Sequence, residues 1–208
     1  MGEEIMDKSL LVDYINFSIP PETITESLTK NAGKLLVQGV IQRANSLNQN
    51  KRFYPKPILM REVEKYQQLI KERRALGELD HPDSSVVNLG NSSHLITSLS
   101  WQGDDLIGTI EILGTPAGNI LKELFKAGVL VGISSRGLGS TKDIGDGAVE
   151  VQDDYEILCW DMVSNPSTQG SFVHPLSEGM DKMLISQVTK YNKANSIIMS
   201  ILMSLSNK

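Results

Sequence analysis

The chain has 208 residues, of which 40% are hydrophobic and 22% are charged. This length and balance are typical of one globular domain with a full core, and they exclude a fibrous or wholly disordered chain. A formal net charge of -5 argues against nucleic-acid binding as the main activity.

The cysteine and histidine counts limit the kinds of site that the chain can build. Cys159 is the single cysteine, which excludes an internal disulfide and a multi-cysteine zinc site. The three histidines, His81, His94 and His174, could hold a metal only together with carboxylates, so we expect no metal and no cofactor. The acidic N-terminus shows no secretory signal, and the apolar cluster 197–205 is too short and interrupted to cross a bilayer. An intracellular soluble protein without a membrane partner is expected.

Composition and periodicity divide the chain into three segments. These are an N-terminal arm (1–33), a central domain (34–176) and a C-terminal helical tail (177–208). The arm contains a strand candidate at 10–15, and Pro20-Pro21 prevents a helix from running through it. The domain opens with a strand at 34–44, rich in branched apolar residues. Apolar residues of the tail recur at spacings of three and four, which predicts a docking or assembly helix.

Two helices and a hairpin are expected inside the domain. One helix begins near Pro57, where a first turn tolerates proline, and ends near Gly77. The strand-like runs 93–103 and 104–113, joined by a Gly-Asp-Asp step, predict an antiparallel hairpin. A second helix follows at 115–128, with a threonine cap and a proline in its first turn. Its inward stripe is expected to comprise Ile120, Leu121, Leu124 and Phe125.

A histidine lies in the short turn Gly77-Glu-Leu-Asp-His-Pro82, beside two carboxylates. A lone histidine is more often structural than catalytic. Here the following proline biases His81 toward an extended backbone, so the imidazole is held in place. Such an imidazole, with a pKa near neutral pH, can act as a general base. His94, which has no polar residue at catalytic spacing, is interpreted as structural.

A glycine-rich stretch, Gly128-Val-Leu-Val-Gly-Ile-Ser-Ser-Arg-Gly-Leu-Gly-Ser140, carries two hydroxyls and a guanidinium. A serine at the end of a rigid strand, with free backbone N–H groups and an arginine nearby, could attack a carbonyl and stabilise the oxyanion. A plain strand running into a Gly/Ser turn is the structural alternative. Since Ser134 and Ser135 point to opposite faces of a strand, only one of them can meet His81.

An acid interrupts the apolar run 155–164. Asp161 must find a partner if it is buried, whereas on an edge strand it could face water. Cys159 is interpreted as a small core residue, because no cation or second thiol lies beside it in the sequence. A histidine, a serine and an acid supply the base, the nucleophile and the orienting group of an acyl-transfer triad. Their chain order matches no common serine hydrolase, and no Gly-x-Ser-x-Gly elbow is present.

Four motifs follow one another along the chain. They are Asn50-Lys-Arg-Phe-Tyr-Pro55, Gly77-Glu-Leu-Asp-His-Pro82, Gly132-Ile-Ser-Ser-Arg-Gly-Leu-Gly-Ser140 and Asp161-Met-Val-Ser-Asn-Pro-Ser167. In order and spacing they resemble the prohead core protease family of T-even-type tailed phages, which is related in fold to assemblin, the herpesvirus capsid-maturation protease. The resemblance implies a serine endopeptidase with an α+β fold, a small and mainly antiparallel β-barrel surrounded by helices.

The resemblance also implies site residues. His81 would be the base, Ser134 the nucleophile and Asp161 the third member of the triad. His174 is an alternative third member, because assemblin uses a second histidine in that role. Ser135 and Arg136 would supply N–H groups or positive charge near the oxyanion, and Arg136 and Arg52 are candidates for a pocket that accepts glutamate before the cleaved bond.

The same resemblance implies the partners of the protein and its location in the cell. The protein would act inside the immature capsid in the host cytoplasm, self-associate there, cleave scaffolding proteins and trim the major capsid protein. Neither nucleic acid nor a membrane is expected as a partner. The alternative hypothesis is a non-catalytic scaffold or core component of the prohead that keeps the same barrel and assembles through its C-terminal helix.

Overall fold

The computed structural model of the protein describes residues 8–17, 27–80, 82, 84–164 and 173–175. The chain forms two compact units, Met1–Pro175 and Leu176–Lys208. The predicted C-terminal helix at 177–208 therefore lies outside the described residues.

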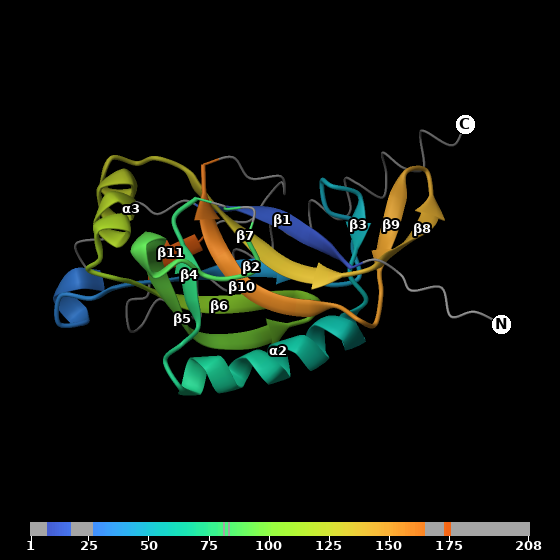
Figure 1. The fold of residues 1–208 in the computed structure, drawn as a ribbon. Helices are drawn as coiled ribbons and strands as arrows, with labels where there is room; N and C mark the ends of the chain where they lie inside the picture. The colour runs from blue at the N-terminus through green and yellow to red at the C-terminus, as the bar shows by residue number, and fades with distance from the viewer. Residues whose placement is uncertain (1–7, 18–26, 81, 83, 165–172, 176–208) are drawn as a thin grey trace. The chain divides into compact units, whose positions relative to one another are not determined.

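Three sheets make up the described part of the first unit (Figure 1). One sheet has the antiparallel order β1 (Ser9–Phe17), β7 (Val131–Gly139), β10 (Glu156–Val163). A second has the antiparallel order β11 (Val173–Pro175), β2 (Leu35–Arg43), β6 (Asp105–Ile112), β5 (Ser92–Gln102), β4 (Leu76–Glu78). The third has the order β3 (Arg52–Phe53), β9 (Ala148–Val151), β8 (Thr141–Gly145), with β3 parallel to β9. The strand at 34–44 and the hairpin at 93–113 are confirmed.

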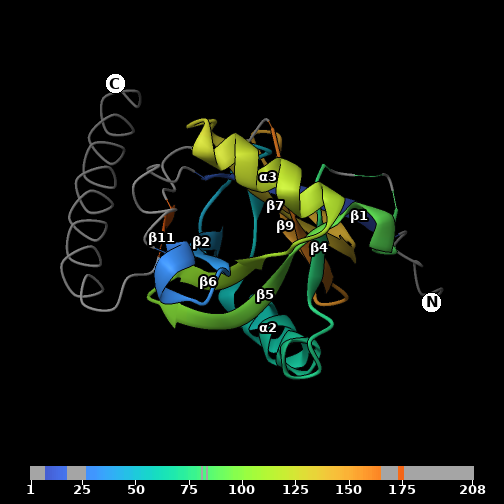
Figure 2. The same ribbon diagram turned by 90° about the vertical axis from the view of Figure 1, so that its left-hand side faces the viewer.

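Helices α2 (Lys56–Lys71) and α3 (Pro116–Lys126) lie on opposite sides of this unit (Figures 1 and 2). A short 3₁₀ helix, η1 (Leu89–Asn91), precedes β5. Helix α2 ends before the predicted stop near Gly77, because Arg73 has a φ of 54° and the chain turns there into β4. None of the helices in the described residues is long and apolar enough to cross a membrane.

Helix α3 begins and ends where its sequence predicts. The Thr115 side chain accepts a hydrogen bond of 3.1 Å from the Gly118 N–H, and Gly128 follows the helix with a φ of 73°. The inward stripe is only partly as predicted: Leu121 and Phe125 are buried, while Ile120 is 55% exposed. The helix therefore buries a narrower face than its apolar spacing indicates.

The main hydrophobic core fills the space between the β7–β10 and β2–β6–β5 layers and reaches Tyr66 of α2. On one side these sheets are joined by a bridge between Leu79 and Met162, where the Asp80 N–H donates to the Met162 carbonyl at 2.8 Å. On the other side β1 contacts β2, but no ladder connects them among the described strands. The mixed α+β class with mainly antiparallel sheets is confirmed, whereas no closed barrel is found among these strands.

The predicted N-terminal arm contributes a strand to the domain. Strand β1, which includes the candidate at 10–15, pairs with β7 from Ser9 opposite Gly139 to Phe17 opposite Val131. Strand β1 accordingly belongs to the same compact unit as the rest of the sheet. Sequence separation hides this pairing, since the partners lie more than a hundred residues apart.

Candidate active site

Ser134 lies in the middle of strand β7, and not at its end as its sequence suggests. The strand continues to Gly139 because β1 pairs with it on one side and β10 on the other. Tyr14 of β1 and Asp161 of β10 are its direct partners in these two ladders. The predicted nucleophile and the predicted acid are therefore cross-strand neighbours, a relation that brings Cβ atoms to about 5 Å on one face of a sheet.

The two adjacent serines point to opposite faces of β7. Ser135 pairs with Asp13 and with Trp160, which belongs to the main core. Ser134 shares its face with Asp161. Both hydroxyls are buried, and neither Oγ atom has a hydrogen-bond partner among the described residues. Ser134 is thus the serine that faces the acid named by the sequence.

Arg136 lies on the same face as Ser134, with its guanidinium fully buried between two carboxylates. Its Nε is 3.0 Å from Asp161 Oδ2, and its Nη2 is 2.8 Å from Glu78 Oε1. Its Nη1 donates to the Ser84 carbonyl at 2.7 Å. Asp161 therefore has a buried cationic partner, and the water-facing alternative for this acid does not hold because its side chain is 0% exposed. The guanidinium that was expected near the oxyanion is therefore bonded to Asp161, Glu78 and the Ser84 carbonyl.

Backbone N–H groups near Ser134 are less free than its sequence suggests. Residues 134–136 have ladder partners on both sides, and in such a position N–H groups ordinarily bond to the neighbouring strands. The glycines after them serve packing: a Cβ on Gly137 would lie 2.6 Å from the Tyr155 hydroxyl and 2.7 Å from the Glu156 carbonyl. The glycine-rich pattern therefore makes room for an aromatic ring of the chain itself.

Cys159 is buried beside the same charged groups. Its Sγ accepts a hydrogen bond of 3.2 Å from Arg136 Nε, and it lies 3.4 Å from Asp161 Oδ1. Burial, together with the neighbouring Asp161 carboxylate, raises the pKa of the Cys159 thiol well above its ordinary value. A thiol that stays protonated is a poor nucleophile, which supports its interpretation as a core residue.

His81 lies outside the described residues, but the strand that leads to it is described. Strand β4 ends at Glu78, whose backbone N–H donates to Asp161 Oδ1 at 3.0 Å. The next two residues form the bridge and the hydrogen bond to Met162. The chain therefore enters the histidine-containing turn directly beside the predicted acid.

His174 belongs to a different part of the unit. Its backbone lies in β11, opposite Gln38 of β2, at the edge of the five-stranded sheet farthest from β4. Its side chain lies outside what the structure describes. The strand order thus separates this residue from the edge that leads to His81.

His94 is fully buried and bonded on both ring nitrogens. Its Nδ1 lies 2.8 Å from Ser93 Oγ and its Nε2 lies 2.9 Å from the Trp160 carbonyl. Burial lowers the pKa of His94 to about 4, although the Asp161 carboxylate and the Trp160 carbonyl act in the opposite direction. A neutral imidazole held between a hydroxyl and a carbonyl has a structural role, as interpreted from the sequence.

The motif at residues 50–55 holds strand β1 in place. Arg52 Nη1 donates to the Val12 carbonyl at 2.7 Å and lies 3.3 Å from Asp13 Oδ1, and the Asn50 side-chain amide lies 2.9 Å from the same oxygen. The Tyr54 hydroxyl also donates to Asp13. Arg52, a candidate for recognising glutamate, is therefore bonded to an acid of the chain. The role of Asp13 as the partner of this motif was not predicted from the sequence.

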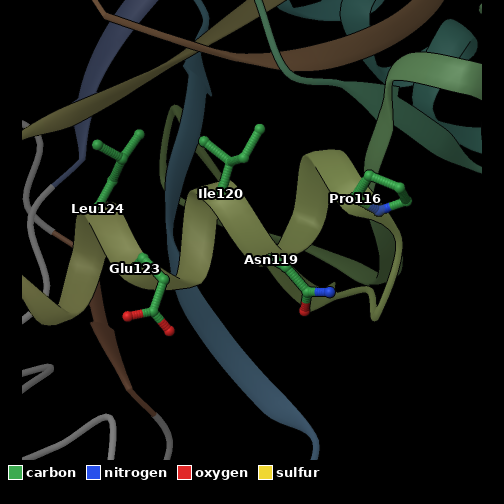
Figure 3. Close-up of a pocket in the computed structure, with 5 residues that line it drawn as sticks. All are labelled: Pro116, Asn119, Ile120, Glu123 and Leu124. Atoms are coloured by element: carbon green, nitrogen blue, oxygen red, sulfur yellow. The ribbon is translucent and has the colours of Figure 1, made fainter.

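A shallow apolar groove on α3 is the pocket shown in Figure 3. Its volume is about 470 Å³, and its lining consists of Pro116, Asn119, Ile120, Glu123 and Leu124. None of the predicted catalytic residues belongs to this groove. Among the described residues no group of three or more histidine, cysteine, aspartate or glutamate side chains is arranged to hold a metal ion.

Comparisons with known proteins agree on one family. A family model described as prohead core protein serine protease matches residues 2–181. The prohead core protein protease of Enterobacteria phage T4 is 33% identical over 145 residues, which is 68% of this chain and 68% of that protein. The solved structure of the bacteriophage T4 capsid assembly protease has a TM-score of 0.66 at 26% identity, covering 76% of this chain and 99% of that one. The resemblance carried by the four motifs is thereby confirmed, and the chain belongs to the prohead core protein serine protease family.

Proposed function

We propose that this protease is a serine endopeptidase in which Ser134 attacks the peptide carbonyl, His81 takes its proton and Asp161 orients the imidazole. The observation that carries the proposal is the direct cross-strand pairing of Ser134 with Asp161, with the carboxylate fixed by Arg136 and by the Glu78 N–H. A buried carboxylate that stays ionised is what stabilises an imidazolium during acyl transfer.

The path of the chain supports His81 as the base. The segment that carries it starts beside Met162, one residue after the acid. The backbone of His174 lies at the far edge of another sheet, which supports Asp161 as the third member of the triad.

Ser135 and Arg136 are proposed to act on the oxyanion without presenting a free side chain to it. The positive charge of Arg136, on the same face of β7 as Ser134, would stabilise the developing negative charge, and the backbone N–H groups would do so only where they leave their strand partners. The commitment of the guanidinium to Glu78 and Asp161 supports an indirect role.

Scaffolding proteins and the major capsid protein are the proposed substrates, cut after glutamate inside the prohead, within the host cytoplasm and after self-association. The names of the T4 relatives support a role in the prohead core and in capsid assembly. Arg136 and Arg52 are both ion-paired within the chain, so recognition of glutamate by either would require exchange of a carboxylate partner.

A barrel of the assemblin type is proposed for the complete fold. The bridge between Leu79 and Met162 already connects two of the sheets. At the other edge of its sheet β1 contacts β2, which lies next to the short edge strand β11. A ladder between β1 and the part of β2 that β11 leaves unpaired would close the barrel.

The proposed function is tested with a co-expressed scaffold substrate. Ser134→Ala and His81→Ala should each lower cleavage by about 10³-fold or more, because each removes a group that takes part in bond making. Asp161→Asn should cost less, since it removes orientation and charge only. Ser135→Ala is the matched control and should retain cleavage if folded. Retained cleavage in Ser134→Ala with loss in Ser135→Ala would move the nucleophile by one residue.

The non-catalytic alternative is favoured by one observation, the complete burial of the Ser134 hydroxyl. A substrate carbonyl reaches this atom only if the residues above the β7 face move. Wild-type protein that leaves a co-expressed scaffold intact under assembly conditions would support the alternative.

A further inference from the structure

Glu78 is a buried carboxylate that the triad does not use. Its Oε1 lies 2.8 Å from Arg136 Nη2 and accepts a hydrogen bond of 3.0 Å from the Asn88 N–H. Its own backbone N–H donates to Asp161. Its Oε2 is buried and has no hydrogen-bond partner among the described residues. A buried carboxylate oxygen without such a partner lowers stability, which points to a role for Glu78 other than stabilising the fold.

The charges around Arg136 do not balance in the described part of the chain. One guanidinium faces two carboxylates, Glu78 and Asp161, and all three side chains are 0% exposed. A buried cluster with an excess negative charge is costly unless a cation completes it. Because Arg136 is shared, it neutralises neither carboxylate fully.

Three other buried titratable groups of the described residues near this cluster are neutral at neutral pH. The Cys159 thiol of β10 stays protonated because burial and Asp161 raise its pKa. The His94 imidazole of β5 is neutral because burial lowers its pKa to about 4. Burial likewise raises the pKa of the Tyr66 phenol of α2. Asp80, which follows β4, is exposed to solvent. Among the described buried groups, Arg136 is therefore the cation that faces Glu78 and Asp161.

We propose that Glu78 is a positioning residue for the protease reaction: its charge occupies Arg136, so that the charge of Asp161 remains available to the catalytic base. This inference rests on the proposed function of Ser134, His81 and Asp161. Without Glu78, Arg136 and Asp161 would form a closed ion pair, and the imidazolium formed during acyl transfer would gain less from the carboxylate. With Glu78, the imidazolium formed during the reaction would be the cation that completes the cluster.

The Glu78→Gln variant tests the negative charge of Glu78 separately from its hydrogen bonds. The amide oxygen can still accept from Arg136 and from the Asn88 N–H, while one negative charge is removed. We expect kcat/KM for a peptide spanning a scaffold cleavage site to fall about tenfold. The acid limb of its pH profile should move to lower pH by about one unit, because removal of a nearby negative charge lowers an imidazole pKa. Glu123→Gln, on the exposed face of α3, is the matched control and should change neither.

Glu78→Asp supplies the complementary variant. It keeps the charge but shortens the side chain, so the rate should fall while the acid limb stays at its wild-type pH. A purely structural role would lower the rate of both variants without moving the acid limb of either, and that result would overturn the proposal. If Glu78→Gln does not fold, an acid limb that moves to lower pH in Glu78→Asp would overturn it as well.

The imidazole can also be titrated without activity. In the inactive Ser134→Ala background, NMR of the labelled histidine ring should show a pKa of His81 that is about one unit lower with Glu78→Gln than without it. An unchanged value would overturn the role of Glu78. Absence of any Ser134-dependent cleavage by the wild type would instead defeat the proposed function, and the titration would still decide whether Glu78 acts on His81.

Discussion

His94 shows how a single buried side chain can make stability depend on pH. Its imidazole is neutral in the folded protein, with a pKa lowered to about 4 from an ordinary 6.5, chiefly by burial. The unfolded chain therefore binds one more proton than the folded one between these two values. Its contribution to stability is fully present above about pH 6.5 and is lost as the pH falls toward about 4.

The protonation of His94 should accordingly lower the free energy of unfolding by about 3 kcal/mol between neutral pH and pH 4. Urea denaturation followed by circular dichroism across this pH range measures that free energy. A His94→Gln variant should be less stable at neutral pH but should lose less of its stability on acidification. Parallel curves for the two proteins would show that other groups cause the pH dependence.

At the scale of elements, two glycines of β7 allow the residues at the start of β10 to pack closely against it. The Tyr155 ring lies against Gly137 and Gly139, and any side chain at Gly137 meets this ring and the Glu156 carbonyl. Crowding against backbone cannot be relieved by a rotamer change, so β7 and β10 would have to separate near the predicted nucleophile.

Gly137→Ala is therefore expected to destabilise the protein by about 1–3 kcal/mol, as overpacking of a core does. Thermal unfolding measures the change. Gly114→Ala is the matched control, because a Cβ at Gly114 meets no atom within 4 Å and its backbone is not left-handed. Equal stability of the two variants would contradict the proposed packing of Tyr155.

Local signals predicted the local elements well. The threonine cap and the proline predicted α3, and the Gly-Asp-Asp step predicted the β5–β6 hairpin, because both depend on neighbouring residues. The extent of β7 could not be predicted in this way. Its glycines suggest a strand end, but the strand is prolonged by β1 and β10, whose pairing depends on residues far away in the sequence.

The candidate site was likewise predictable where it depends on local motifs and unpredictable where it depends on the tertiary fold. The residue types for a triad were visible in three motifs, and the pairing of Ser134 with Asp161 supports the choice between two adjacent serines. The partner of Arg136 was not predictable, because Glu78 and Arg136 meet only through the tertiary fold. One signal was present: Glu78 lies in the same quoted motif as His81.

Across the whole molecule, the sheet that carries Ser134 depends on the N-terminal strand. Asp13 of β1 is bonded by Asn50, Arg52 and Tyr54, so the loop after β2 fastens β1 to the side of β7. Without β1, the buried Tyr54 hydroxyl and the partly buried Arg52 guanidinium would lose their Asp13 partner, and β7 would have an open edge.

Deletion of residues 1–17 should therefore abolish cleavage and lower the thermal midpoint by 10 °C or more, on the order of several kcal/mol. Differential scanning calorimetry and the scaffold assay measure the two effects. Deletion of residues 1–6 removes the chain before the strand and is the control, with both properties retained. A stable and active protein lacking residues 1–17 would mean that β7 does not need its N-terminal partner.

The order β1-β7-β10 also has a consequence for synthesis of the protein. The first strand leaves the ribosome early, but its partner starts at Val131 and the strand with Asp161 ends at Val163. Pairings of such long range form late and slowly. A nascent chain therefore carries no assembled Ser134–Asp161 pair until the residues of β10, up to Val163, have been translated.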